Sequence, residues 1–219
     1  MAHISSIGAG MYSDLSLAFN AAGIAPPPNL SQPPANLETA FHAMFVTEIP
    51  AVGGVLTATS FIRIKNVRTF PAIGTPPNIV NVPTYGQSTS LQIQGQADAP
   101  SMEITLNYVA NDWGAANPLG KMVGSGVQGT FRFALLNNPP KTGWGSLPAE
   151  IGQIENTLWY FVGKIDSLLV TPNLTDANQA TIAITMNSPV YGAYTIANVV
   201  ALTAQTAGEA AEQARQELA

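Results

Sequence analysis

Cysteine is absent from this sequence of 219 residues. Its absence excludes disulfide bonds, thiolate zinc sites and cysteine nucleophiles, and it is typical of proteins made in a reducing compartment. Histidine is almost absent too, since only His3 and His42 occur. Neither a metal triad of imidazoles nor a serine–histidine–acid set can be assembled from two histidines. We therefore predict a non-enzymatic protein with no metal and no cofactor.

Charged residues are also scarce. Asp, Glu, Lys and Arg make up 10% of the chain, against roughly 25% in ordinary soluble domains. A surface this poor in charge would aggregate if it were exposed, so we expect copies of the chain to cover much of it. The net charge of −5 argues against a protein that grips nucleic acid with clustered cations. A mild negative charge suits the wall of a channel through which a polyanion passes without being held.

Long apolar runs are missing as well. No window of about 18 apolar residues occurs without polar interruption, which argues against a membrane-spanning helix. The first residues, Met-Ala-His-Ile-Ser-Ser-Ile, lack the basic start of a signal peptide. A porin-like barrel is a weaker alternative, because the strands are too few and the aromatic girdles are missing. We expect synthesis in the cytoplasm and no membrane insertion.

The strongest pattern present is a strand, turn and strand over residues 157–171, 172–178 and 179–187. The second strand alternates strictly between two faces, as a half-buried strand requires. Small neutral polar side chains on the outer face suit a surface that packs on a neighbour or lines a channel. The unit therefore indicates self-assembly. The inner face carries Ala180, Ile182, Ile184 and Met186, and the outer face carries Thr181, Ala183, Thr185 and Asn187.

Three segments divide the chain: a Pro-rich arm (1–36), a β domain (37–200) and a helical tail (201–219). The arm is either a disordered linker or a segment laid across a neighbour. A short helical patch over residues 14–19 would dock through Leu15 and Phe19, which are spaced at i and i+4.

The β domain is predicted to contain several strands, one short helix and two long loops. Asn117 can cap the helix, and Pro118 suits its first turn. The predicted elements are a hairpin of strands 40–49 and 55–67, a loop over 70–87, antiparallel strands 90–96 and 101–108, a helix over 117–124, a strand over 129–136, a loop over 137–151 and a strand over 191–200.

One basic cluster occurs, formed by Arg63, Lys65 and Arg68. We expect it to project from one side of a strand together with Phe61, and Ile62 and Ile64 to take the other side. A solvated strand end or an ion pair with an acidic neighbour explains it better than contact with nucleic acid, because three charges bind DNA weakly.

Trp113 and Trp144 lie in predicted loops. They suit interface anchors or platforms for carbohydrate stacking, whereas Trp159 follows the pattern of a strand core. Together with Leu15, Phe19 and Tyr191, the two loop tryptophans are our candidate interface residues.

The order of these elements resembles the tail tube, or major tail, proteins of long-tailed bacteriophages. The most recognisable segment of that family is an F-x-G-x-I/V-x-S strand, then a turn and a Thr-rich strand. Here the motif maps to Phe161, Gly163, Ile165 and Ser167. The resemblance covers roughly residues 88–188.

The resemblance implies a mainly β fold, an antiparallel β-sandwich that forms a β-barrel on assembly, with one short flanking helix, long loops and extended terminal arms. It also implies a virion protein of a non-contractile tail that forms hexameric rings, stacked as the conduit for DNA ejection. Its partners would be itself, other tail proteins at the tube ends and passing DNA, bound without sequence specificity. The arm 1–36 and the two long loops would bridge rings. Candidate lumen or inter-subunit charges are Arg63, Lys65, Arg68, Asp98, Glu103 and Asp166.

Other readings stay open at this point. The tube of a contractile tail or a type VI secretion system would share the fold. A carbohydrate-binding β-sandwich, acting as an attachment module, would use Trp113 and Trp144 as platforms.

Overall fold

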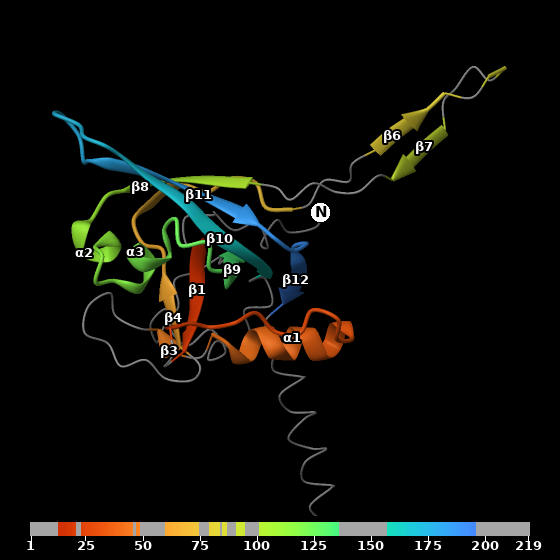
Figure 1. Ribbon diagram of the computed structural model, residues 1–219, viewed down its shortest axis with the longest axis horizontal. Coiled ribbons are helices and arrows are strands. Elements are labelled where there is room, and N and C mark those ends of the chain that lie inside the picture. Colours follow the sequence, from red (N-terminus) through yellow and green to blue (C-terminus); the bar gives the residue numbers. More distant parts are fainter. Residues whose placement is uncertain are drawn as a thin grey trace, which may run out of the picture.

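The computed structural model describes residues 13–20, 23–45, 47–48, 60–74, 79–83, 85–86, 91–94, 101–135 and 157–195. These residues form a mainly β structure with a curled sheet and short helices (Figure 1). Its strands are β1 (Asp14–Asn20), β2 (Gly23–Ile24), β3 (Thr47–Glu48), β4 (Ser60–Arg63), β5 (Val67–Thr69), β6 (Ile79–Val82), β7 (Leu91–Gln94), β8 (Ser101–Asn107), β9 (Gly129–Leu135), β10 (Thr157–Thr171), β11 (Gln179–Met186) and β12 (Tyr191–Thr195). Its helices are α1 (Pro34–Ala43), α2 (Ala110–Trp113) and α3 (Pro118–Met122).

Ten strands form one sheet in the order β3-β4-β1-β9-β10-β11-β8-β5, with β12 on β10 and β2 on β1. Every described pairing in this sheet is antiparallel except that of β3 with β4. Strand β10 is long enough to pair with β9 through its first half and with β11 through its second half. The sheet curls at this strand (Figure 1). Because strands outnumber helices among the described elements and almost all pairings are antiparallel, the predicted mainly β, antiparallel class is confirmed.

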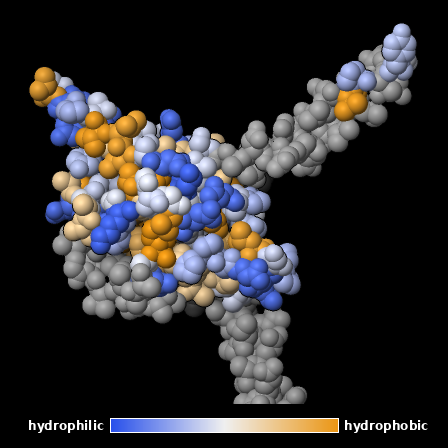
Figure 2. Space-filling view, in the orientation of Figure 1, coloured by the Kyte–Doolittle hydropathy of each residue, from blue (hydrophilic) through white to orange (hydrophobic). Residues whose placement is uncertain are grey.

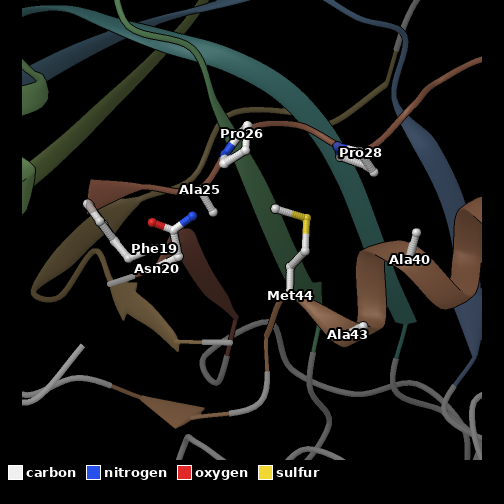
Figure 3. A pocket seen from close by; sticks show the side chains of 8 residues that line it. All are labelled: Phe19, Asn20, Ala25, Pro26, Pro28, Ala40, Ala43 and Met44. Carbon is white, nitrogen blue, oxygen red and sulfur yellow. The ribbon is translucent and has the colours of Figure 1, made fainter. Parts of the chain in front are cut away.

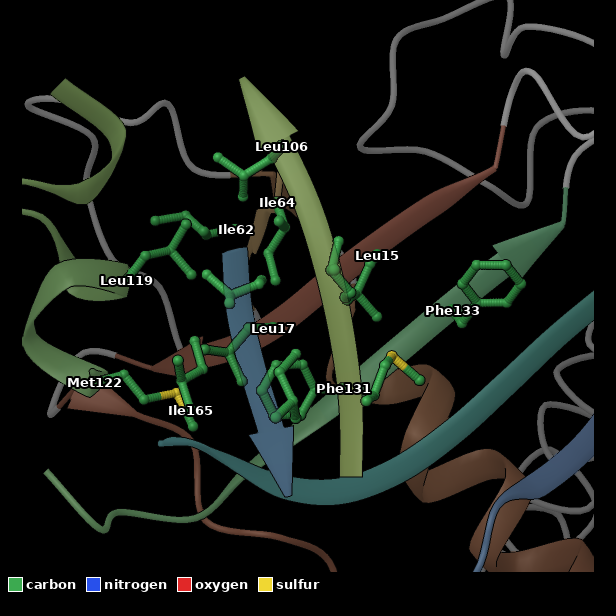
Figure 4. Close-up of a cluster of buried hydrophobic side chains, with 14 of the residues drawn as sticks. Leu15, Leu17, Ile62, Ile64, Leu106, Leu119, Met122, Phe131, Phe133 and Ile165 are labelled. Carbon is green, nitrogen blue, oxygen red and sulfur yellow. The ribbon is translucent and has the colours of Figure 1, made fainter. Parts of the chain in front are cut away.

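A large apolar core fills the concave side of the curled sheet (Figure 4). Leu15, Leu17 and Phe19 of β1 enter it because alternate residues of a strand share one face. Helix α3 covers one side of this core with Leu119 and Met122. Strands β8 and β11 contribute their inner faces, whose residues are Met102, Ile104, Leu106, Ala180, Ile182, Ile184 and Met186.

A second, aromatic core lies between α1 and the other side of the sheet. Phe41 of α1 stacks on Tyr160 of β10, with ring centroids 4.9 Å apart and nearly parallel planes. Phe45 packs on Phe61 and on Tyr160. The guanidinium of Arg132 lies over the rings of Phe45 and Phe61, at 4.7 and 4.6 Å from their centroids. Helix α1 therefore covers this side of the sheet.

The predicted helical patch at residues 14–19 is wrong. The segment is β1, a strand that lies between β4 and β9 and is buried along almost its whole length. The alternation of Leu15, Leu17 and Phe19 has a period of two, which outweighs the i, i+4 spacing of its first and last members. The described residues between 13 and 36 therefore belong to the β domain and do not form a separate arm.

The predicted strand over residues 40–49 is also wrong. Residues 34–43 form α1, which starts with Pro34 at its first helical position and buries Leu37 and Phe41 at i and i+4. The predicted hairpin with 55–67 does not form either, because β3 pairs with β4 in parallel. Ile62 and Ile64 enter the large core as expected, but Phe61 is buried in the aromatic core.

The predicted loop over residues 70–87 and the predicted pairing of strand 90–96 with strand 101–108 also differ from the structure. Strand β7 pairs with β6 and not with β8, so a hairpin forms within and beside the predicted irregular loop. Figure 1 shows this hairpin reaching away from the body of the sheet. The prolines around it are typical of a loop, but the four-residue strands fit between them.

Other predictions are confirmed. The hairpin of β10 and β11 forms with the expected inner face, and Asn117 caps α3 by accepting a hydrogen bond from the backbone N–H of Leu119. Strands β8 and β9 match the predicted positions to within one residue. The predicted loop 137–151, the predicted tail 201–219 and the end of the predicted strand 191–200 lie outside the described residues.

Candidate assembly surfaces

The F-x-G-x-I-x-S motif lies where β10 changes partner from β9 to β11. Phe161 and Ile165 are fully buried in the large core. Gly163 pairs with both Gly129 of β9 and Met186 of β11. A Cβ atom at Gly163 would lie 2.7 Å from the backbone oxygen of Thr185. The glycine is therefore needed because the backbones of β10 and β11 approach closely at this point.

The outer face of β8 and β11 is rich in hydroxyl and amide groups. Cross-strand pairs on this face join Thr181 to Thr105 and Ala183 to Glu103. All of these residues are half-buried except Glu103, which is exposed. The expected polar face of β11 therefore continues onto β8, where Glu103 adds a charge.

Asp166 extends this face onto β10. Its carboxylate lies 2.8 Å from Nζ of Lys164 and accepts a hydrogen bond from the hydroxyl of Thr185. The hydrogen bonds from Lys164 and Thr185 lower the pKa of this carboxyl. The face thus carries the carboxylates of Glu103 and Asp166 against the one ammonium group of Lys164, which gives it a slight acidic excess.

The far half of β10 is an apolar edge. Beyond Gly163, β10 pairs only with β11 among the strands that the structure describes. On its other side the backbone oxygen of Ile165 accepts a hydrogen bond from the N–H of Gly124. Leu169 and Val170 are 66% and 43% exposed, and Leu174 in the following turn is fully exposed. Figure 2 shows hydrophobic side chains along this projecting hairpin.

Strand β5 is the opposite edge of the same part of the sheet. Within the described ranges it pairs with β8 alone. Its Arg68 forms an ion pair with Asp176 in the β10–β11 turn, with Nη2 and Oδ2 2.9 Å apart. The strands β10, β11, β8 and β5 therefore form a patch with two edges, one at β10 and one at β5.

The basic cluster acts through ion pairs, as expected for two of its three members. Arg63 donates from Nε to Oδ1 of Asp14 at 2.7 Å, and Arg68 pairs with Asp176. Lys65 is half-buried. The cluster is divided between separate partners, so it does not present three free charges to nucleic acid.

Most of the candidate interface residues that can be placed are core residues. Leu15 and Phe19 are 0% and 2% exposed, and Trp113 is 6% exposed in α2, within the large core. Their predicted role as docking residues is wrong, and Trp113 cannot act as a carbohydrate platform. Tyr191 is half-buried and packs on Phe41, with ring centroids 5.4 Å apart. Trp144 and Asp98 lie outside the described residues.

The structure brings together one polar cluster that the sequence did not reveal. The hydroxyl of Tyr160 lies 2.6 Å from Nδ1 of His42, and Nε2 of His42 lies 3.5 Å from Oε1 of Glu38. Glu38 and His42 are spaced at i and i+4 on α1, but Tyr160 is 118 residues away from His42. No local sequence signal links them, because only the docking of α1 on β10 brings them together.

Burial sets the protonation of this cluster. It lowers the pKa of His42 to about 4, with a further contribution from the positive charge of Arg132. It also raises the pKa of the Tyr160 hydroxyl and that of the Glu38 carboxyl. The hydroxyl therefore stays protonated and donates to Nδ1 of His42. The imidazole proton then lies on Nε2 and faces the Glu38 carboxylate, which avoids lone-pair repulsion.

Among the described residues, no group of three or more His, Cys, Asp or Glu side chains could hold a metal ion. No helix in the described part of the chain is long and apolar enough to cross a membrane. A scan against protein-family models finds no match. A search of curated proteins also finds no match.

Proposed function

We propose that this chain is a structural subunit that assembles into rings through its sheet edges, and that these rings stack as the hollow tail tube of a long-tailed bacteriophage. The observation that carries the proposal is the far half of β10. It is an edge that exposes Leu169 and Val170 on a strand already held in place by β11. The resemblance of the sequence to tail tube proteins adds the expectations of six copies in a ring and of DNA passing through the channel.

Edge pairing follows from the physical chemistry of sheets. An exposed apolar edge presents backbone N–H and C=O groups to which another strand can hydrogen-bond. Monomeric proteins usually protect such edges with charged side chains. The edge at β10 has no charged residue from Ser167 to Thr171. Pairing the β10 edge of one copy with the β5 edge of the next is a heterologous contact, and such contacts close into rings when the rotation allows.

The outer face of β8 and β11 is the proposed channel wall. Ring closure through β10 and β5 would join these faces into one continuous surface. Hydroxyl and amide groups with a slight acidic excess, from Glu103 and Asp166 against Lys164, would repel phosphates weakly and offer no cluster of cations to hold them. Such a wall suits the passage of a polyanion.

The hairpin of β6 and β7 is the proposed contact between rings. Its register places Val80 opposite Ile93 and Val82 opposite Leu91, so one set of cross-strand pairs is wholly aliphatic. The other set pairs Ile79 with Gln94 and Asn81 with Gln92. A two-stranded hairpin is at best marginally stable alone in water. A neighbouring copy would supply the surface that stabilises it.

Placing positive charges on the exposed edge of β10 tests this proposal. We expect the double variant Leu169→Lys and Val170→Lys to remain folded, because both side chains are exposed, but to lose assembly because lysines repel an incoming edge. The matched control is Asn173→Lys and Thr175→Lys, which places the same charges in the exposed turn of the same hairpin. Sedimentation velocity at a series of concentrations reports the assembly state. Equal assembly of the edge variant and the control would reject the β10 edge as the contact.

A further inference from the structure

An apolar groove lies between α1 and the segment that leads into it (Figure 3). Its volume is about 320 Å³. Pro26 and Pro28 form one wall, and Ala40, Ala43 and Met44 form the other, with Phe19 at one end. None of the described residues that line the groove is charged.

The groove exists because of the residues on its two walls. Proline has no backbone N–H, so the 25–29 segment cannot extend the sheet here and passes over α1 as irregular chain. The alanines of α1 are too small to fill the space between the helix and this segment. A volume of this size lies at the low end of cavities that hold small ligands, so it matches one large side chain better than a whole hairpin.

The β6–β7 hairpin carries a side chain of the matching kind. Tyr85 is fully exposed, and the following Gly86 has a φ of 83°, which turns the chain in a conformation that favours glycine. A tyrosine supplies a large, rigid apolar ring with a polar tip, and such residues are enriched among interface anchors. Figure 1 shows the hairpin pointing away from α1, so a tyrosine on it can meet such a groove only on another copy.

We propose that Tyr85 of one copy inserts into the groove of Pro26, Pro28, Ala43 and Met44 on the next copy. The inference rests on the proposed assembly and names the residues that make its contact between rings. Burying the ring against prolines, alanines and a methionine removes apolar surface from water on both sides, and it desolvates no charged side chain among the described residues of the groove.

Leu174 is the competing occupant, since it is also fully exposed at a hairpin turn. Two observations favour Tyr85. The exposed edge of the β10–β11 hairpin is already assigned to pairing with β5 of the next copy in the ring, whereas β6 and β7 pair only with each other among the described strands. Asp176 and Arg68 pair beside Leu174, and seating that turn in an apolar groove would desolvate both charges.

The absence of cysteine allows a direct test by disulfide capture. We would prepare Tyr85→Cys and Ala43→Cys as separate variants, mix them well above the concentration that assembly needs once the Tyr85 ring is lost, and oxidise them after assembly. A disulfide forms only when the two Cα atoms come within about 7 Å. We expect covalent dimers in the mixture well above the level in either variant alone. The matched control mixes Leu174→Cys with Ala43→Cys, which should give only the background level.

A second measurement uses the side chain itself. Tyr85→Ser should raise the concentration needed for half-assembly about tenfold or more, as expected for an interface anchor, whereas Tyr85→Phe should change it little. Assembled particles without the Tyr85→Cys to Ala43→Cys disulfide, or with equal capture of Leu174→Cys, would overturn this inference and leave the proposed function standing. A protein that stays monomeric at every concentration would overturn both.

Discussion

The hydroxyl of Tyr160 lies 2.6 Å from Nδ1 of His42, and this contact joins helix α1 to strand β10 across the aromatic core. Burial, with a further contribution from the positive charge of Arg132, lowers the pKa of His42 and keeps it neutral in the folded protein, in a cluster that Glu38 and Tyr194 also face. The docking of α1 therefore depends on the protonation of one imidazole. The same helix forms one wall of the apolar groove.

Acid should destabilise the protein through His42. Its pKa falls from 6.5 to about 4 on folding, so the unfolded chain takes up the proton first as the pH falls. Stability is fully present above pH 6.5 and is lost between about pH 6.5 and 4, by roughly 3 kcal/mol at one pKa unit per 1.4 kcal/mol. Glu38 acts in the opposite direction, because its raised pKa costs stability as the pH rises above 4.5.

Urea unfolding of the wild type and of His42→Gln across this range measures the effect. The difference in unfolding free energy between the two proteins should shrink by about 3 kcal/mol from pH 7 to pH 4. His3→Gln should follow the wild type. Parallel curves for the wild type and His42→Gln would show that His42 does not carry this pH dependence.

The ion pair of Asp14 and Arg63 should contribute much more than that of Arg68 and Asp176. The first pair is almost buried, with side chains 4% and 14% exposed, whereas the second pair is 36% and 50% exposed. Removing one partner of a buried pair costs about 3–5 kcal/mol, whereas an exposed pair is screened by water and contributes little. Unfolding of Asp14→Ala and Asp176→Ala compares the two, and similar losses would contradict the structure.

Replacement of Gly163 by alanine should destabilise the hairpin at its base. The added Cβ would lie 2.7 Å from the backbone oxygen of Thr185, which cannot move without separating β10 from β11. We expect a loss of about 2 kcal/mol or more, whereas Ser167→Ala on the same strand should change stability by about 0.5 kcal/mol or less. Thermal unfolding of both variants measures the difference. A Gly163→Ala protein as stable as the control would refute the close approach of the two strands.

Strands with strict alternation could be predicted from the sequence. In β11, Ala180, Ile182, Ile184 and Met186 alternate with small polar residues, and the structure buries all four. The N-cap and the apolar face of α3 could also be predicted, because Asn117, Leu119 and Met122 are local signals. Each of these elements is decided by residues within one short segment.

Elements decided by distant partners could not be predicted. In Asp14–Asn20 the alternation of Leu15, Leu17 and Phe19 is a local strand signal, but the burial of nearly every residue of this strand depends on β4 and β9, which come 40 to 120 residues later. Helix α1 has no side-chain cap at Pro33, and its buried face is narrow. The burial of Trp113 and the cluster around His42 likewise arise only when α2 and α1 dock on the sheet.

Electron microscopy of the purified protein, at high concentration and without detergent, tests the central claim most directly. The account predicts rings or stacked tubes with a central channel, in which the β10 edge of each copy meets the β5 edge of the next. Dispersed single copies at the same concentration would contradict it.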